Sequence, residues 1–530
     1  MRRRGEHAIL ILAILFFLIF FGISLNLLKL SQERDYVRTA ADSSYITIHA
    51  GESSGTIYDR NFQPLVNQKK NIVAVAVPAE ISLEELKEYA ADISLLEIEY
   101  QKGKPFAFKC VKTGEESEGV TFFKIPQRYG RNIPAPHVIG YISDGEGISG
   151  LEYAYNKLFR IGSTENSVTY STDGHGNILI GGGKSVVRST KDKTGVVTTL
   201  DSEIQAICEK AGRSLGKGAI VVSDVRNGEI LAMASFPEYD INNLTAAFEN
   251  EDSPMINRCL YSFSVGSVFK LVTACEGLNE GLTEFMCNCS GGHTMGELSF
   301  ACHNRNGHGV QNMKEAMTNS CNPYFITLSQ CLDLQKYRSL AYNLGFGREI
   351  HLAAGIISSA GVLPSVDDLL VPAELANFSF GQGRLSATPL QINQMTCAIA
   401  NGGELVMLRL IKGITVDGKT IGNEKSSLSS RVISEETSAE LRKMMISAIY
   451  NNENSKATPR YVMAGAKTST AQTGIFDENG EELCHGWITG FYPASNPRYA
   501  ITVLAEHGGY GNDSAAPVFK EIVDEMMMRE

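Results

Sequence analysis

The hydrophobic pattern first marks a membrane-spanning segment. Residues 8–28 form an apolar run without a charged side chain, and at about 1.5 Å per residue a helix of this length spans roughly the 30 Å hydrocarbon core of a bilayer. Arginines occupy positions 2–4, so the positive-inside rule predicts a cytoplasmic tail at residues 1–7 and an extracellular remainder. A cleaved signal peptide is the alternative, but its apolar core would be shorter, and residues 26–30 offer no small-residue cleavage site.

Residues 29–195 form a polar stretch with short β-type runs, such as residues 71–77. A helix is expected over residues 82–91, because Ser82 can cap it and a glutamate follows three residues later. Residues 166–193 are weakly hydrophobic and are expected to be extended. Since this stretch carries no candidate catalytic cluster, we interpret it as an N-terminal pedestal or dimerisation-like module, a spacer and interaction platform.

Residues 196–530 have the pattern of a second domain. A helix can begin after Asp201, and two strand patterns follow around an Asn-Gly turn typical of a hairpin. Strands and a helix are predicted again near the end of the chain. The predicted strands are 219–225, 229–234, 486–492 and 499–505, and the predicted last helix is 516–528. Strands from both ends around a helical middle predict an α+β domain, with one antiparallel sheet, helices on both of its faces and a helical insert.

The chain carries a formal net charge of −11. A nucleic-acid-binding protein presents a basic footprint, which this composition lacks. Nucleic acid is therefore not an expected partner.

Three short motifs in the second domain carry the candidate chemistry. They are Ser267-Val-Phe-Lys270, Ser320-Cys-Asn322 and Lys467-Thr-Ser469. Their order is the informative property, because an S-x-x-K at a helix start, then S-x-N, then a strand with K-T-G is a known arrangement for acyl transfer through a serine ester. Other stretches match one of the motifs but fail on their order in the chain or on the predicted structure around them. They are Ser214-Leu-Gly-Lys217, Ser24-Leu-Asn26, Lys112-Thr-Gly114 and Lys193-Thr-Gly195.

Ser267 is the candidate nucleophile and Lys270 the candidate base. Ser267 begins an apolar run that predicts a helix, whose free N–H groups would point at the serine oxygen. Lys270 lies one helical turn later and therefore on the same face. Burial and a second cation, Lys467, would lower its pKa so that it can accept a proton. An isolated S-x-x-K is more often only a helix cap with a surface lysine.

If the other two motifs lie next to Ser267, their residues can take part in catalysis and in substrate binding. Ser320 would relay a proton and Asn322 would hold a peptide substrate, although by themselves they could simply cap or turn the chain. Lys467 and Thr468 would offer a charge and a hydroxyl to a substrate carboxylate. The N–H groups of Thr470 and Ser267 would form the oxyanion hole, and the strand that carries residues 467–470 could align an extended peptide.

The cysteines show no framework of disulfides. Their number is odd at 11, and most are expected to be buried as small apolar side chains. The densest group, which includes nearby histidines, is Cys287, Cys289, His293, Cys302, His303 and His308. Its spacing lacks the paired C-x₂-C pattern of a zinc site. We expect these side chains simply to pack in a loop. A local disulfide involving Cys302 is the second alternative, and a zinc site is the third.

The motifs and their surroundings resemble the transpeptidase domain of class B penicillin-binding proteins. The resemblance covers residues 196–530 strongly and is thinner in residues 29–195. The matching text is Gly218-Ala-Ile-Val-Val, Gly228-Glu-Ile-Leu-Ala-Met-Ala-Ser235, Gly307-His-Gly309, Phe380-Gly-Gln-Gly383, Thr388-Pro-Leu-Gln391, Thr470-Ala-Gln472, His485-Gly-Trp487 and Ala516-Pro-Val518, with Gly55-Thr-Ile-Tyr-Asp-Arg-Asn61, His137-Val-Ile-Gly-Tyr141 and Gly150-Leu-Glu152 near the N-terminus. The departures are Ser54 for a usual arginine, Val265 for a usual proline, and Ser469 for the glycine of K-T-G.

The resemblance implies a penicillin-binding/serine β-lactamase-like fold and a peptidoglycan D,D-transpeptidase. The protein would be a single-pass protein of the cell membrane that cross-links stem peptides outside the cell, is acylated by β-lactams and needs no metal or cofactor. Its implied partner is a polytopic SEDS-type glycosyltransferase of elongation, division or sporulation. The implied site residues are Ser267, Lys270, Ser320, Asn322 and Lys467 for catalysis and Thr468, Ser469 and Thr470 for substrate binding.

Three alternatives share the motifs. A class D-like β-lactamase or β-lactam sensor does not explain the long N-terminal module. A D,D-carboxypeptidase would use water in place of an amine. A catalytically weak scaffold could activate a glycosyltransferase, and Ser469 is the feature that favours this third alternative.

Overall fold

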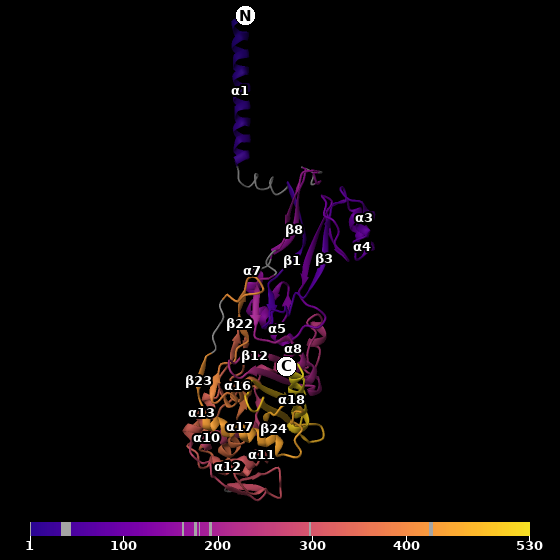
Figure 1. The fold of residues 1–530 in the computed structure, drawn as a ribbon. Helices are drawn as coiled ribbons and strands as arrows, with labels where there is room; N and C mark the ends of the chain where they lie inside the picture. The colour runs from indigo at the N-terminus through magenta and orange to yellow at the C-terminus, as the bar shows by residue number, and fades with distance from the viewer. Residues whose placement is uncertain are drawn as a thin grey trace. The chain divides into compact units, whose positions relative to one another are not determined.

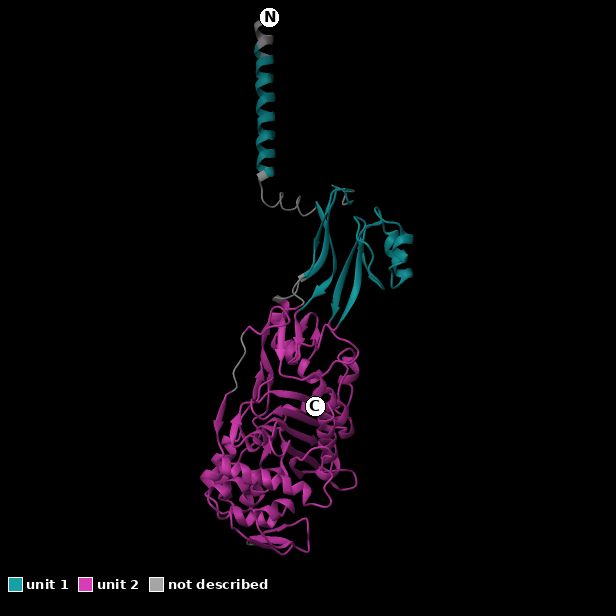
Figure 2. Ribbon diagram, viewed as in Figure 1, with its two compact units in different colours: residues 1–54, 69–127, 163–192 teal, residues 55–68, 128–162, 193–530 magenta. Residues whose placement is uncertain are grey.

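The computed structural model describes residues 2–32, 44–161, 164–173, 177–179, 181–189, 193–295, 298–422 and 428–529. The chain forms two compact units, coloured separately in Figure 2. Unit 1 comprises residues 1–54, 69–127 and 163–192, and unit 2 comprises residues 55–68, 128–162 and 193–530. Residues 55–68 and 128–162 thus pack with the C-terminal part of the chain, whereas the predicted boundary lies at residues 195 and 196. That boundary between modules stays a prediction.

Unit 1 begins with the long apolar helix α1 (Arg2–Gln32). Its segment Ile9–Lys29 has a mean hydropathy of 2.8 and is long and apolar enough to cross a membrane. In the described part of the chain it is the single helix with these properties. The helix agrees with the anchor expected over residues 8–28.

The rest of unit 1 is two small antiparallel sheets and two short helices. One sheet has the order β1-β8-β9 and the other has the order β4-β3-β5. Side chains of the second sheet pack on one face against the helices and on the other against β8. The bounds are β1 (Tyr45–Ser53), β3 (Lys69–Ala76), β4 (Phe106–Cys110), β5 (Val120–Gln127), β8 (Thr164–Ser171), β9 (Lys184–Val187), α3 (Leu83–Lys87) and α4 (Ile93–Gln101).

The predicted β run at residues 71–77 is confirmed in β3, but the helix predicted over residues 82–91 is wrong in extent. Ser82 does cap α3, accepting a hydrogen bond from the N–H of Glu85. The helix then ends because Ala90 pairs with Cys110 on β4, and Asp92 caps a new helix, α4. Cross-strand pairing thus overrides the local helix signal. Of the stretch expected to be extended, residues 166–171 in β8 and 184–187 in β9 are confirmed, whereas Gly181 lies in a turn between them.

Unit 2 is built on the five-stranded antiparallel sheet β12-β11-β26-β25-β24 (Figure 1). Its strands come from both ends of the domain, since β11 pairs with β12 on one side and with β26 on the other. This confirms the predicted α+β class and the antiparallel sheet. The bounds are β11 (Gly218–Asp224), β12 (Ile230–Phe236), β24 (Gly465–Phe476), β25 (Glu482–Tyr492) and β26 (Tyr499–Ala505).

Helices cover both faces of this sheet. Alternate residues of β11 join two different cores, one shared with α8 (Ser202–Gly212) and α18 (Gly511–Met527), the other with α16 (Pro389–Ala400). The last helix begins at Gly511 rather than at the predicted residue 516, with Tyr510 at the N-cap position and Pro517 accommodated in the helix. The helical insert lies between β12 and β24. It includes α10 (Lys270–Asn279), α11 (Met313–Thr318), α12 (Asn322–Ser329), α13 (Leu334–Asn343), α15 (Pro372–Ser379) and α17 (Glu435–Tyr450).

Candidate active site

Ser267 lies in a tight turn that leads into helix α10. The turn is a 3₁₀ segment, Gly266–Phe269, and not the first turn of an α-helix as the sequence had suggested. Gly266 has a positive φ of 64°, and its N–H donates to the carbonyl oxygen of Gly381 over 2.7 Å. A Cβ atom on Gly381 would lie 2.1 Å from the carbonyl oxygen of Gly266, so this close approach requires glycine.

Lys270, one turn after Ser267, is fully buried. Its Nζ donates to Asn322 Oδ1 over 2.6 Å, to the carbonyl oxygen of Ser320 over 2.7 Å and to Ser320 Oγ over 3.3 Å. Within the described residues its hydrogen bonds thus go to the S-x-N motif and not to Ser267. Lys467 reaches the same hydroxyl from strand β24, because its Nζ donates to Ser320 Oγ over 3.0 Å. Ser320 Oγ therefore lies between two lysines.

Both lysines have lowered pKa values. Burial is the main cause for Lys270, and the neighbouring charge of Lys467 lowers its pKa further, which is the direction expected from the sequence. Burial lowers the pKa of Lys467 to about 8. A buried lysine next to another cation loses its proton more readily, so this environment favours Lys270 as a proton acceptor.

Strand β24 alternates its side chains between the cavity and the interior. Ser469 is 3% exposed and its Oγ donates to the carbonyl oxygen of Val265 over 2.9 Å, whereas Thr468 and Thr470 are half-buried. Thr470 Oγ1 accepts from the N–H of Gly511 over 3.2 Å. The hydroxyl at the unusual position 469 thus points towards the turn before Ser267.

Six of the eight predicted site residues line one cavity of about 300 Å³, and the other two, Lys270 and Lys467, are buried beneath it. An adjoining cavity of about 670 Å³ shares Ser267, Asn322 and Thr470. The six residues that line the smaller cavity are Ser267, Ser320, Asn322, Thr468, Ser469 and Thr470. The structure therefore brings together motifs that are 53 and 147 residues apart, counted from Ser267 to Ser320 and from Ser320 to Lys467.

Three polar residues that the motifs do not indicate line the same cavity, and they are His303, Tyr510 and Asn512. His303 and Tyr510 also line the larger cavity. Tyr510 is 71% exposed and stands at the N-cap position of α18. The sequence does not indicate Tyr510, because the last helix is predicted to begin only at residue 516. The role that the sequence suggests for His303 is that of a metal ligand.

A group of thiols lies immediately behind the S-x-N motif. One ligand atom from each of Cys289, Cys302, His308 and Cys321 lies within 4.8 Å of the others. These cysteines are free thiols, so the local disulfide considered for Cys302 is not formed in the structure. A hydrogen bond with Cys321 lowers the pKa of the Cys302 thiol.

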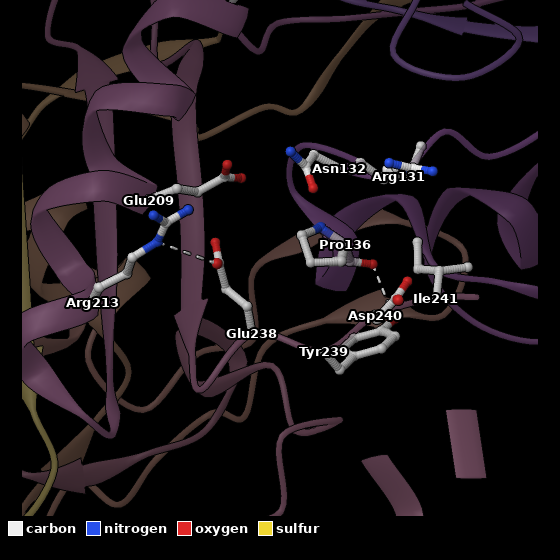
Figure 3. A pocket seen from close by; sticks show the side chains of 10 residues that line it. Arg131, Asn132, Pro136, Glu209, Arg213, Glu238, Tyr239, Asp240 and Ile241 are labelled. Atoms are coloured by element: carbon white, nitrogen blue, oxygen red, sulfur yellow. Dashed lines mark hydrogen bonds and ion pairs between the residues drawn. The ribbon is translucent and has the colours of Figure 1, made fainter. Parts of the chain in front are cut away.

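A separate cavity of about 320 Å³, shown in Figure 3, lies outside the motif cluster. Two of its acidic side chains, Glu209 and Glu238, have raised pKa values, chiefly because they are buried. For Glu238 the pKa is about 7, and Arg213 Nε lies 4.0 Å from its carboxylate. No motif residue lines this cavity, so we place the candidate active site at the motif cluster.

The model of one protein family matches residues 218–524. It describes the penicillin-binding protein transpeptidase domain. The match includes all three motifs and most of unit 2.

Individual proteins agree with this match. The chain is 27% identical to stage V sporulation protein D of Bacillus subtilis, over 88% of this chain and 77% of the relative. It is 29% identical to the peptidoglycan D,D-transpeptidase MrdA of Acinetobacter baumannii, over 73% of this chain and 64% of that protein, which is less than two thirds of its length. The solved complex between penicillin-binding protein 2 and MreC from Helicobacter pylori has a similar fold, with a TM-score of 0.66 at 22% identity, covering 92% of this chain and 98% of that one.

Proposed function

The chain belongs to the family of penicillin-binding protein transpeptidase domains, and we propose that it is a serine-type peptidoglycan D,D-transpeptidase that β-lactams inhibit. The observation that carries the proposal is the pair of hydrogen bonds that Ser320 Oγ accepts, over 3.3 Å from Lys270 and over 3.0 Å from Lys467, beside a cavity lined by Ser267. Two buried lysines on one hydroxyl form a route for protons next to a nucleophile. A purely structural cluster would not need such a route.

In the proposed reaction Ser267 Oγ attacks the carbonyl carbon of the bond between the last two D-alanines of a stem peptide. Neutral Lys270 takes the hydroxyl proton, and Ser320 gives a proton to the leaving amine and receives one from Lys270, so that free D-alanine departs and a serine ester remains. The amine of a second stem peptide then attacks the ester, and Ser267 recovers its proton. The N–H groups of Ser267 and Thr470 would stabilise the oxyanion in both steps.

The remaining polar groups would bind the peptide. Asn322 Oδ1 accepts from Lys270 over 2.6 Å, which orients its amide for a substrate carbonyl. Thr468 and Thr470 line the cavity from strand β24, and Lys467 supplies positive charge for the terminal carboxylate. Ser469 lies on this strand with its hydroxyl turned to Val265, so we assign it backbone contacts only. This orientation weakens the alternative of a catalytically weak scaffold.

Helix α1 supports the proposed localisation, and the resemblance of the sequence to class B penicillin-binding proteins supports the proposed partner. We propose that α1 anchors a single-pass protein in the cell membrane with unit 2 on the extracellular side. A polytopic SEDS-type glycosyltransferase is the proposed partner, contacted through α1 and unit 1. Protease added to intact cells should degrade unit 2, and protection from protease would reverse this topology.

Labelling with fluorescent penicillin tests the proposed function. Full-length protein in detergent should form a covalent adduct that survives denaturing gel electrophoresis, and Ser267→Ala should abolish the adduct. Ser214→Ala is the matched control, because Ser214 stands in the other S-x-x-K and its hydroxyl donates to the carbonyl oxygen of Ala211 outside the cavity. Labelling that persists in Ser267→Ala would refute the proposed nucleophile.

A further inference from the structure

Four side chains that the proposed reaction does not use meet beside the S-x-N motif. The Sγ atoms of Cys289, Cys302 and Cys321 and a ring nitrogen of His308 lie within 4.8 Å of one another, and Cys302 Sγ is 3.6 Å from His308 Nδ1. The three cysteines are buried and the histidine is half-buried. A tetrahedral zinc ion, with bonds of about 2.0–2.3 Å, keeps its ligand atoms roughly 3.5–3.8 Å apart. Cys302 Sγ and His308 Nδ1 are already at this spacing, and the other ligand atoms, at up to 4.8 Å, would need to close by about 1 Å to form one coordination shell.

The backbone around these residues is held in place independently of the side chains. Strand β14 (Cys287–Cys289) pairs with β17 (Gly309–Gln311) so that Cys289 is opposite Gly309. The N–H of His308 donates to the carbonyl oxygen of Cys289 over 3.0 Å. Gly307 has a φ of +81°, and a Cβ atom on it would lie 2.3 Å from that same oxygen, so only glycine fits there.

The other two cysteines enter from different elements. Cys302 follows β16 (Leu298–Ala301), and its N–H donates to the carbonyl oxygen of Gly291 over 3.0 Å. Cys321 precedes α12, and its N–H donates to the carbonyl oxygen of Ala316 over 2.9 Å. Three separate segments therefore converge on the four side chains, which is the geometry of a preformed site.

The chemistry of the donors selects the ion. Three thiols and one imidazole are soft ligands that favour zinc over magnesium or calcium, which prefer oxygen. A single disulfide would use only two of the sulfur atoms and leave the third and the imidazole without a partner of this kind. We propose that Cys289, Cys302, His308 and Cys321 bind one structural zinc ion with all four of its coordination positions filled by the protein.

The position of Cys321 gives this ion a consequence for the active site. Cys321 is the middle residue of Ser320-Cys321-Asn322, and Ser320 has a left-handed backbone with a φ of 50°. Such a conformation persists where the surroundings fix it. Zinc bound to Cys321 would hold the two neighbours against Lys270, so the four ligands are positioning residues. The positioning role of the four ligands rests on the proposed acyl-transfer function, whereas zinc binding itself does not.

Metal content is the direct test. Full-length protein purified in detergent without chelators should contain about one zinc per chain by mass spectrometry. Cys302→Ser and His308→Ala should each remove it, while Cys331→Ser should keep it, because Cys331 is exposed and outside the cluster. Cobalt in place of zinc should give the sulfur-to-metal charge-transfer band of a thiolate site. Protein that stays zinc-free after incubation with zinc, or a mapped disulfide between Cys302 and Cys321 in the active protein, would overturn the proposal.

The positioning role is tested by rescue. His308→Ala should lower the rate of penicillin acylation by about tenfold or more, and His308→Cys, which restores a zinc ligand, should recover both the zinc and the rate. Equal acylation rates with and without zinc would overturn the positioning role alone. Zinc in a protein that penicillin does not label would leave the metal site standing and refute the proposed function.

Discussion

The hydroxyl of Ser469 donates a hydrogen bond of 2.9 Å to the carbonyl oxygen of Val265, two residues before Ser267. Both positions depart from the motif pattern that the sequence resembles, which has a glycine at 469 and a proline at 265, so the two departures contact each other. The same hydroxyl would lie 2.3 Å from a Cβ atom on Gly266. It therefore fills the space beneath the turn that carries the nucleophile.

Ser469→Gly should change the rate of penicillin acylation by less than about tenfold, or about 1.4 kcal/mol in the barrier. The lost hydrogen bond is worth about 1 kcal/mol of stability, and it lies on the far side of the strand from Thr468 and Thr470. Ser469→Ala, which loses only the hydroxyl, is the control. Acylation rates measured over time with fluorescent penicillin check this. A much larger gain would mean that the natural protein is an impaired enzyme, and the scaffold function would then be favoured.

Lys270→Ala should remove acylation almost as completely as Ser267→Ala. The two residues act as one unit, so the losses should not add in the double variant. Lys217→Ala, in the decoy motif, should leave the rate unchanged. Single-turnover labelling measures all four variants, and a Lys270→Ala rate within a few-fold of the unmodified protein would place the base elsewhere.

Much of this site could be predicted because its residues lie in motifs whose order carries the information. Ser267, Ser320 and Asn322 line one cavity as the motif order suggested, and β24 alternates as a strand should. The sheet with strands from both ends of the domain could also be predicted, since β11 and β26 each have a strongly apolar pattern.

The parts that could not be predicted depend on long-range packing. Cys289, Cys302 and Cys321 have no regular spacing, and only the packing of three segments brings their sulfur atoms together. The partners of Lys270 were missed for a similar reason, because helical spacing indicates Ser267 while burial directs the lysine to Ser320. Tertiary contacts also decided where α3 ends.

Acylation should decline above about pH 8 in the unmodified protein. Burial lowers the pKa of Lys467 to about 8, so below that pH the lysine is charged and can attract a substrate carboxylate, and above it the charge is lost. The rate should also fall at low pH, where Lys270 is protonated. In Lys467→Arg the charge persists, so the decline at high pH should move upwards even if the maximal rate is smaller. Rates across the pH range check this, and an unchanged decline in Lys467→Arg would assign it to another group.

Glu238→Gln should stabilise the protein at pH 8 and have little effect at pH 5. Burial, and then the charge of Glu209, raise the pKa of Glu238 from 4.5 to about 7, while Arg213 opposes the shift. The folded protein therefore binds this proton more tightly than the unfolded chain does. The contribution of the proton to the free energy of unfolding is complete below about pH 4.5 and is lost as the pH rises through about 7. Glutamine removes the charge that is costly above that pH, a gain of about 1–2 kcal/mol after allowance for partial exposure. The expected rise in Tm is roughly 1–3 °C at pH 8, because 1 kcal/mol shifts Tm by only about 1 °C in a domain as large as unit 2. Glu249→Gln, at an exposed position, is the control, and an equal rise for Glu238→Gln at both pH values would exclude titration of Glu238 as its cause.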